Sequence, residues 1–335
     1  MRRRIGMTRI KVISRLACLC FVIVISACSK ESDMTVWNSL SGQAPLVIAH
    51  RGASGVLPEH SLAAYERAIE MGADFIEPDL VITKDGVLVA RHDRYLSGST
   101  DVSDRPEFAD RKTVKAGHDD PDWFVEDFTL EEIKTLKARQ PREGRSKDFD
   151  DQYDIPTFDE VLELIQNSSN ELGRPIGVYP ETKHPAALAA LGLSHDAPLL
   201  ASLKKYGFHD ASDPVFIQSF ELENLERLKD LTSIRLIFLT DKVPDFEQIA
   251  KTAHGIGPYK ILLIDEAGNS TDFIQDAHKA GLEVHPWTFR DDDKNPAFED
   301  IDAELKAYYA LGVDGVFSDF PDTALRVRDS FKDIK

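Results

Sequence analysis

The sequence predicts an α/β protein, a closed (β/α)8 (TIM) barrel with an insertion after the second strand. Two observations predict this fold. Between residues 45 and 330, short apolar runs alternate eight times with helical segments, as expected for parallel strands joined by helices. Eight such units in about 290 residues suit a closed barrel better than an open, doubly wound sheet. We therefore expect one large domain over residues 45–330, with functional residues at the C-terminal ends of its strands.

The expected strands are short and mostly apolar, and each is followed by a helical segment. The strands lie at Leu46–His50, Asp74–Val81, Pro175–Tyr179, Pro214–Ser219, Ile234–Leu239, Tyr259–Ile264, Glu283–Thr288 and Gly315–Ser318. The helices lie at Ser61–Met71, Phe158–Asn167, Ala186–Tyr206, Leu222–Leu231, Asp245–His254, Asp272–Ala280, Ala297–Leu311 and Asp322–Phe331.

One connection departs from this spacing. More than 70 residues separate the second strand from the next helix, where a loop of about 2–6 residues is usual. Val87–Arg91 suits an additional strand, and residues 96–153 form a polar insertion with a helix expected at Leu130–Lys137. Trp123 and Phe128 favour a packed segment over a disordered loop. We expect the insertion to lie over the C-terminal mouth of the barrel.

The N-terminus has the pattern of a bacterial lipoprotein signal peptide. In residues 1–27, six basic residues and no acidic one accompany an apolar run from Leu16 to Ala27, which is too short to span a bilayer. The run ends in Ile25-Ser26-Ala27-Cys28, which resembles a lipobox. We expect Cys28 to become the lipid-modified first residue and residues 28–44 to be a polar tether. The alternative is an ordinary cleavage site with an incidental cysteine.

This interpretation places the mature protein in the periplasm or cell envelope as a membrane-anchored lipoprotein. Ser29, rather than Asp, after the lipidated cysteine favours the outer over the inner membrane. The three cysteines, Cys18, Cys20 and Cys28, all lie at or before the cleavage point. The mature domain therefore offers no thiolate for zinc or an iron–sulfur cluster.

The charge balance limits the possible partners. Loss of residues 1–27, with their six positive charges, takes the formal charge from −18 to −24. So acidic a surface argues against nucleic acid and anionic lipid as broad-surface partners. An anionic substrate then needs a bound cation and a few local basic groups. Nothing in the pattern indicates an oligomeric state.

Three carboxylates at neighbouring strand ends suggest a metal site. Glu77 and Asp79 are two residues apart in the second strand and so project to the same side. Glu181 follows the third strand. Carboxylates that face one another repel unless a cation lies between them. An oxygen-rich set of this kind suits one hard divalent cation, either Ca²⁺ or Mg²⁺.

Basic groups at the same strand ends suggest phosphodiester chemistry. His50 and Arg51 follow the first strand, His92 follows the hairpin after the second, and Lys183 follows Glu181. A cation with Arg51 and Lys183 can neutralise a phosphate. Two histidines can deprotonate the nucleophile and protonate the leaving oxygen. The residues alone thus predict metal-assisted phosphodiester cleavage.

The order and spacing of these motifs resemble the glycerophosphodiester phosphodiesterase family across residues 46–326. The motifs are His50-Arg51-Gly52, Pro58-Glu59-His60-Ser61, Ile76-Glu77-Pro78-Asp79, Thr83-Lys84-Asp85-Gly86, His92-Asp93, Phe128-Thr129-Leu130, Ile155-Pro156-Thr157, Tyr179-Pro180-Glu181-Thr182-Lys183, Gln218-Ser219-Phe220 and Phe317-Ser318-Asp319. The closest resemblance is to the periplasmic branch that releases glycerol 3-phosphate.

The resemblance implies a role for each matching residue. His50 and His92 would be the general acid–base pair, with Glu59 supporting the site. The metal ligands would be Glu77, Asp79 and Glu181. Arg51 and Lys183 would contact the phosphate, and Phe220 and Trp287 would surround the glycerol. Family members commonly attack with the neighbouring glycerol hydroxyl, through a cyclic phosphate that water opens. The expected substrates are glycerophosphocholine, glycerophosphoethanolamine and similar diesters. The sequence does not say which histidine acts first.

Two other readings remain open at this point. A lysophospholipase D-like or sphingomyelinase-like enzyme would favour an exposed apolar rim, and the insertion has no strong apolar cluster. A non-catalytic surface lipoprotein would be indicated by loss of a catalytic histidine or ligand, and all are present. Residues without a motif are expected in solvated positions: Asp291-Asp292-Asp293, His118, His195, His209, His254 and His278.

Overall fold

The computed structural model describes residues 37–331. The predicted signal peptide, the predicted lipidation at Cys28 and most of the predicted tether lie outside these residues. Within them, no helix combines the length and the apolar character needed to cross a membrane.

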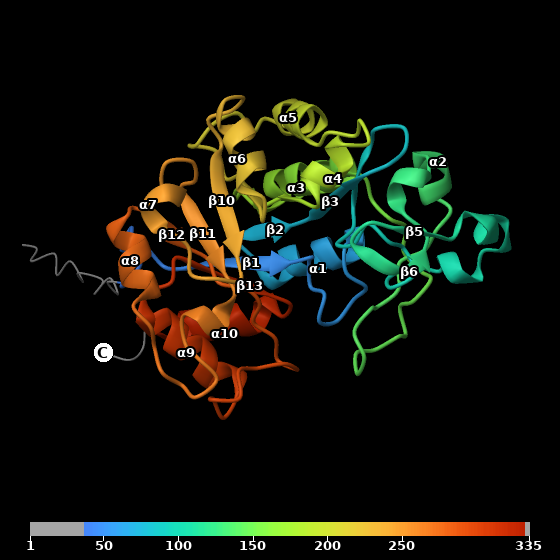
Figure 1. The fold of residues 1–335 in the computed structure, drawn as a ribbon. Helices are drawn as coiled ribbons and strands as arrows, with labels where there is room; N and C mark the ends of the chain where they lie inside the picture. Colours follow the sequence, from blue (N-terminus) through green and yellow to red (C-terminus); the bar gives the residue numbers. More distant parts are fainter. Residues whose placement is uncertain (1–36, 332–335) are drawn as a thin grey trace, which may run out of the picture. The chain divides into compact units, whose positions relative to one another are not determined.

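Eight strands pair side by side around a closed barrel within residues 37–331 (Figure 1). They are β1 (Leu46–His50), β2 (Phe75–Glu77) with its continuation β3 (Asp79–Ile82), β7 (Gly177–Val178) with its continuation β8 (Glu181–Thr182), β9 (Phe216–Ser219), β10 (Arg235–Thr240), β11 (Gly255–Pro258), β12 (Glu283–Val284) and β13 (Gly315–Ser318). β1 pairs in parallel with β2 and with β13. Backbone bonds from Asp314 to Val284 and from Phe317 to Pro286 join β13 to β12 and close the ring. The predicted barrel is confirmed.

Pro78 and Pro180 divide the second and third strands. Proline has no N–H to donate, so the ladder changes partners at each of them. Before Pro78, β2 pairs with β1 and β7, whereas after it β3 pairs with β8 and, antiparallel, with β4 (Leu88–Ala90). This hairpin, expected from the sequence, directs the chain after β4 back to the mouth of the barrel.

Helices cover the outside of the barrel. They are α1 (Leu62–Met71), α3 (Phe158–Leu172), α4 (Pro185–Ala189), α5 (Asp196–Lys205), α6 (Leu222–Lys229), α7 (Phe246–Ile249), α8 (Phe273–Lys279), α9 (Ile301–Leu311) and α10 (Pro321–Ser330). Thr157 and Glu160 form a capping box at the start of α3. The segment expected as one helix at Ala186–Tyr206 is instead two, because the chain turns at Gly192, whose φ of 81° suits glycine.

The position predicted for the sixth strand is wrong. The strand is Gly255–Pro258, and Tyr259–Ile264, expected as a strand, is a loop with a 3₁₀ turn at Lys260–Leu262. Glycine and proline normally indicate a turn, whereas here Gly255 and Gly257 leave room for the neighbouring strands. A Cβ on Gly255 would lie 2.7 Å from Ile237 Cδ1 and 2.8 Å from Glu283 O. Close packing between adjacent strands therefore selects a residue that is rare in strands.

Aromatic rings fill the centre of the barrel. Tyr179 lies 4.8 Å from Phe216 and 5.1 Å from Phe317, measured between ring centroids, and Phe75 lies 5.3 Å from Phe216. A Cβ on Gly177 would lie 2.2 Å from the Phe75 ring, so this strand position leaves no room for a side chain. These rings form a solid base for the polar residues at the strand ends.

The insertion after the second strand is folded. It contains α2 (Leu130–Ile133), three 3₁₀ turns and a small antiparallel sheet of β5 (Thr113–Lys115) and β6 (His118–Asp122). Trp123 and Phe128 pack with Val81 and Val89 of the barrel's own hairpin in a separate apolar core. Figure 1 shows β5, β6 and α2 grouped beside the barrel strands. The packing expected from the aromatic residues is present.

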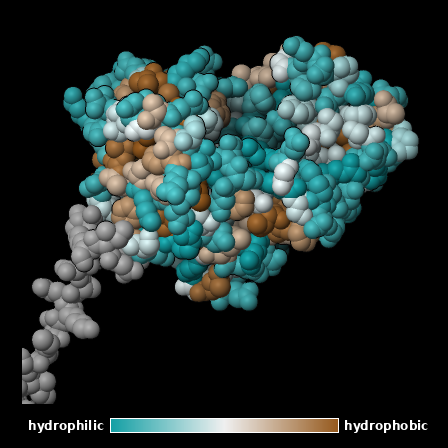
Figure 2. Space-filling model, turned by 90° about the horizontal axis from the view of Figure 1, so that it is seen from below, coloured by the Kyte–Doolittle hydropathy of each residue, from teal (hydrophilic) through white to brown (hydrophobic). Residues whose placement is uncertain are grey.

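Residues 37–43, which the sequence assigns to the tether, also pack on the domain. The Trp37 ring lies 6.1 Å from Tyr309 and 5.4 Å from Phe331. Leu40 donates its N–H to Asp314 Oδ1 at 2.6 Å. The face drawn in Figure 2 is mostly hydrophilic, with apolar patches interrupted by polar residues, in keeping with the high charge of the chain.

His195 is expected to make the fold less stable in acid. It directly precedes α5 and is 1% exposed, so its expected solvated position is wrong. Its Nε2 lies 3.0 Å from Leu80 O. Burial lowers the pKa of His195 from 6.5 to about 4. The unfolded chain therefore binds this proton first, and stability is lost as pH falls from 6.5 towards 4.

The test compares the free energy of unfolding of wild type and His195→Gln by chemical denaturation at pH 7 and pH 5. The wild type is expected to lose roughly 2 kcal/mol more than the variant over this interval. Equal losses in the two proteins would contradict the assignment.

Candidate active site

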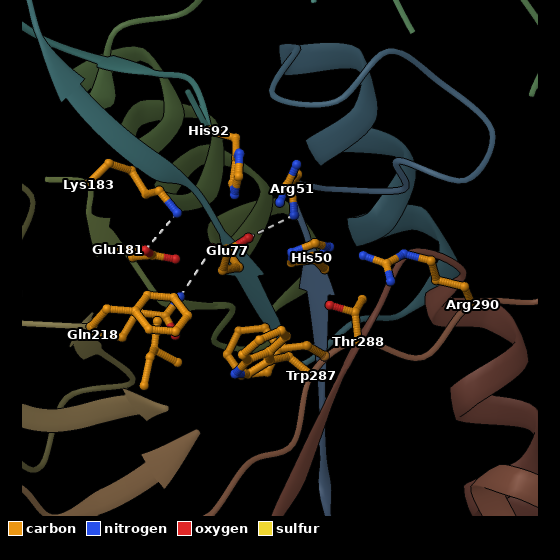
Figure 3. A pocket seen from close by; sticks show the side chains of 13 residues that line it. His50, Arg51, Glu77, His92, Glu181, Lys183, Gln218, Trp287, Thr288 and Arg290 are labelled. Carbon is orange, nitrogen blue, oxygen red and sulfur yellow. Dashed lines mark hydrogen bonds and ion pairs between the residues drawn. The ribbon is translucent and has the colours of Figure 1, made fainter. Parts of the chain in front are cut away.

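One pocket at the mouth of the barrel gathers the predicted site residues (Figure 3). It is lined by His50, Arg51, Glu77, His92, Glu181, Lys183, Gln218, Phe220, Leu239, Trp287, Thr288, Arg290 and Phe317. Two further predicted residues, Glu59 and Asp79, are ion-paired with Arg51. The chain thus brings together, at one mouth, groups from the first, second, third, fourth and seventh strands.

Glu77, Asp79 and Glu181 form a compact group that could hold a metal ion. One oxygen from each lies within 4.8 Å of the others, and all three side chains are buried. β3 pairs with β8 so that Asp79 stands opposite Glu181. Asp79 Oδ1 is buried and has no hydrogen-bond partner within the described residues. This all-oxygen set with an unsatisfied ligand atom fits the predicted Ca²⁺ or Mg²⁺.

The group is charged unevenly when no cation balances it. Burial and the nearby Asp79 and Glu181 raise the pKa of Glu77 well above its usual range. Burial also raises the pKa of Glu181 to about 8, although Lys183 opposes the shift. For Asp79 burial acts in the same direction, but Lys183, His60 and Arg51 together hold its pKa well below the usual range. Asp79 is thus the ionised member.

Arg51 and Lys183 are held against these carboxylates. Arg51 Nη1 donates to Glu59 Oε2 at 2.9 Å, and its Nε lies 3.2 Å from Asp79 Oδ2. Its left-handed φ of 61° lets its backbone N–H donate to Glu77 Oε2 at 2.8 Å. Lys183 Nζ lies 2.8 Å from Glu181 Oε1. Glu59 therefore fixes Arg51 at the pocket wall.

His50 is oriented by a carboxylate from the other end of the chain. Its Nδ1 lies 2.6 Å from Asp319 Oδ1, directly after β13. Asp319 is buried, yet bonding to His50 and the charges of Arg290 and Arg145 hold its pKa well below the usual range. Burial and Arg51 lower the pKa of His50 to about 4. His50 is therefore neutral at pH 7, with the proton on Nδ1 and a free electron pair on Nε2.

His92 reaches the pocket from the segment after β4. Its Nδ1 lies 2.8 Å from Asp93 Oδ1, and its side chain is 33% exposed, against 12% for His50. A carboxylate thus again holds Nδ1 of a histidine that lines the pocket. The two histidines thus have similar partners but different access to solvent.

An aromatic wall stands opposite the charged groups. The Phe220 and Trp287 rings lie 5.7 Å apart, and Lys183 Nζ is 5.8 Å from the Phe220 ring centroid. Trp287 Nε1 donates to Gly257 O at 2.8 Å, which fixes the indole. Phe220 is 43% exposed, so much of its ring is accessible at the pocket. The wall therefore offers an apolar surface beside a cationic one.

Several site residues lie in recognised motifs but received no role from the sequence. Asp319 binds His50, His60 Nε2 lies 2.9 Å from Asp79 Oδ2, and Gln218 Nε2 donates to Glu77 Oε1 at 3.1 Å. Each is a polar residue at a strand end or turn, and this position was the signal in the sequence that could have marked it as a site residue. Arg290 and Arg145, both bonded to Asp319, lie outside the motifs, so no sequence signal marked them.

Comparison with known proteins identifies the family. The glycerophosphoryl diester phosphodiesterase family matches residues 50–323. The chain belongs to this family. A glycerophosphodiester phosphodiesterase of Haemophilus influenzae is 31% identical over 92% of this chain and 96% of its own length, and that of Bacillus subtilis is 32% identical over 94% and 96%. The structure of a phosphodiesterase of Oleispira antarctica was solved with the product sn-glycerol-3-phosphate. It superposes with a TM-score of 0.62 and 25% sequence identity, and the match covers 87% of this chain and 100% of the Oleispira chain. The enzyme activity predicted from the motifs is confirmed.

Cation binding at Glu77, Asp79 and Glu181 is expected to release protons at pH 7. Burial raises the pKa of Glu181 to about 8 and shifts that of Glu77 in the same direction, so the metal-free site favours protonated carboxyl groups, whereas a cation requires the ionised forms. Affinity should therefore rise with pH up to about 8. Titration calorimetry with Ca²⁺ and Mg²⁺, in buffers of different ionisation enthalpy, measures both quantities.

In the same titrations Glu181→Gln should weaken binding more than about tenfold. Glu266→Gln removes an exposed carboxylate elsewhere and should leave the affinity unchanged. Unchanged affinity in Glu181→Gln, or proton uptake by the wild type, would exclude the site.

Proposed function

We propose that this phosphodiesterase hydrolyses glycerophosphodiesters, such as glycerophosphocholine and glycerophosphoethanolamine, to sn-glycerol 3-phosphate and an alcohol, with one bound Ca²⁺ or Mg²⁺. The observation that carries the proposal is the single pocket that holds three clustered carboxylates, two carboxylate-bound histidines and two basic groups. The product bound to the Oleispira relative supports the same chemistry.

Glu77, Asp79 and Glu181 would hold the cation, and Arg51 and Lys183 would contact the phosphate. When bound, the cation supplies positive charge that lowers the cost of electron density on the phosphoryl oxygens. Arg51 and Lys183 keep their charge at neutral pH, because neighbouring carboxylates raise the pKa of both. Phosphate oxygens can bond to their remaining N–H groups without separating them from Glu59 and Glu181.

His50 would act as the first base. Its neutral ring, with Nδ1–H directed to Asp319, presents the Nε2 electron pair to the pocket. The glycerol hydroxyl next to the phosphate gives its proton to Nε2 as its oxygen bonds to phosphorus. The bond from phosphorus to the alcohol breaks, and His92 protonates the departing oxygen. The more exposed position of His92 suits a leaving group that exits to solvent.

The second half of the reaction reverses these roles. A water molecule gives a proton to His92 and attacks the cyclic phosphate, while His50 returns its proton to the glycerol oxygen. The ring opens to sn-glycerol 3-phosphate, and both histidines regain their starting protonation. Phe220 and Trp287 would pack against the carbon face of the glycerol, which is common to all these substrates.

Hydrolysis is expected to require the cation and both histidines. The domain from residue 29 onward should release glycerol 3-phosphate from glycerophosphocholine with Ca²⁺ or Mg²⁺ and lose turnover in EDTA. His50→Ala and His92→Ala should each lower kcat by about 10²-fold or more, since each removes an acid–base group. A coupled glycerol-3-phosphate assay measures both. Release of choline without glycerol 3-phosphate would instead indicate a lysophospholipase D-like cut, and no turnover of any diester would favour a binding protein.

We also propose that the enzyme is a lipoprotein of the cell envelope, anchored through Cys28. The basic start, the short apolar run and the small residues before Cys28 support this location. The enzyme would then encounter glycerophosphodiesters close to the membrane whose phospholipids release them.

Lipidation should depend on Cys28 alone. In bacteria that express the full chain with labelled palmitate, wild type should carry the label and sediment with membranes, whereas Cys28→Ser should carry none. Cys20→Ser, in the apolar run of the same signal, is the matched control and should behave as wild type. Label retained in Cys28→Ser would disprove the anchor.

A further inference from the structure

Arg145, near the end of the insertion, is buried where three barrel loops meet. Its side chain is 3% exposed. Nη2 donates to Asp319 Oδ2 at 2.7 Å, Nε to Asp292 Oδ2 at 2.7 Å, and Nη1 to Ser54 O at 3.0 Å. These partners follow β13, β12 and β1. Asp292 stays in the solvated loop expected from the sequence, with its side chain 39% exposed, and bonds to Arg145 from there.

A second residue of the insertion joins the same place. Gln140 Nε2 donates to Ser54 O at 3.0 Å and to Leu57 O at 3.2 Å. The Arg145 guanidinium also lies 5.4 Å from the Phe320 ring centroid. Arg142, which is more exposed, donates to Asp293 Oδ2 at 3.0 Å. Residues 140–145 are therefore fixed to the barrel by directed bonds from three side chains, beyond the apolar core that holds the rest of the insertion.

Asp319 divides its two oxygens between different tasks. Oδ2 accepts from Arg145 and from Arg290 Nε, at 2.7 and 2.8 Å, while Oδ1 faces His50 Nδ1 at 2.6 Å. Two guanidinium groups on one oxygen set the plane of the carboxylate. Oδ1 then has one orientation, and the His50 ring can bond to it in only one position.

Arg145 does not line the substrate pocket, whereas Arg290 does. Arg145 therefore does not contact the substrate, and among its partners Asp319 is the one that bonds to the ring of a pocket residue, His50. The groups that would bind substrate have anchors of their own, since Arg51 bonds to Glu59, Lys183 to Glu181 and Trp287 to Gly257.

We propose that Arg145 is a positioning residue for His50, acting through Asp319, so that the insertion completes the catalytic site. The inference rests on the proposed role of His50 as acid–base group. Without Arg145, Asp319 keeps one guanidinium and can turn towards Arg290, and His50 loses its fixed partner. The proton-transfer geometry is then lost while substrate binding is retained.

Steady-state kinetics on glycerophosphocholine test the proposal. Arg145→Ala should lower kcat by about 10–100-fold with KM within about twofold of wild type, as for other residues that orient a catalytic group. Arg145→Lys keeps the charge but not the fork of donors, and it should retain more activity than the alanine variant. Guanidinium ion at low, non-denaturing concentration should restore part of the activity of Arg145→Ala.

Arg139→Ala is the matched control. Arg139 belongs to the same segment and is also held by two aspartates, Asp104 and Asp151, but both lie within the insertion. Its loss should leave kcat and KM unchanged. An equal fall in kcat in both alanine variants, or a fall in Arg145→Ala that neither lysine nor guanidinium offsets, would show a general structural effect and overturn the proposal.

A readout that is independent of turnover separates this inference from the proposed function. Proton NMR of the wild type should show a downfield resonance from the His50 Nδ1–H bonded to Asp319, which His50→Gln removes and so assigns. Arg145→Ala should shift or broaden it, and Arg139→Ala should not. An unchanged resonance in Arg145→Ala would disprove the link, whether or not the wild type hydrolyses a glycerophosphodiester.

Discussion

The burial of three carboxyl groups side by side is the constraint on which the rest of the site depends. Glu77, Asp79 and Glu181 are brought together by strand pairing, and burial makes their charge costly. Arg51 and Lys183 compensate part of it, and a divalent cation would compensate the rest. The same cationic groups are the ones a phosphate needs. The carboxylates that could hold a metal ion and the basic groups proposed to bind phosphate thus form a single electrostatic arrangement.

The barrel supplies this arrangement with rigid support. Aromatic rings fill the space below the carboxylates, and strands closed into a ring leave no edge along which the site could open. Prolines within two strands change the ladder just where Glu77, Asp79 and Glu181 stand, so the ligands sit at points where the strands already deviate from regular pairing. The geometry is therefore determined by backbone that is hard to deform.

Much of this could be predicted from the sequence because its signals are local. His50, Glu77, Asp79 and Lys183 stand in short motifs next to apolar strands, and a barrel places strand ends together. What could not be predicted depends on contacts between distant segments. The strand that begins at Gly255 requires glycine there because its neighbours leave no space for a side chain. His195 is buried through its contact with β3. The partnership of Asp319 with Arg145 spans 174 residues and has no pattern in the chain.

The bond between His50 and Asp319 joins the first barrel strand to the last, across 269 residues. A ribosome therefore completes the histidine long before it adds the carboxylate that orients it. In the proposed mechanism the base is therefore aligned only when the final strand closes the ring and brings Asp319 to His50. An enzyme that follows this mechanism is inactive in the compartment in which it is made until its synthesis has nearly finished.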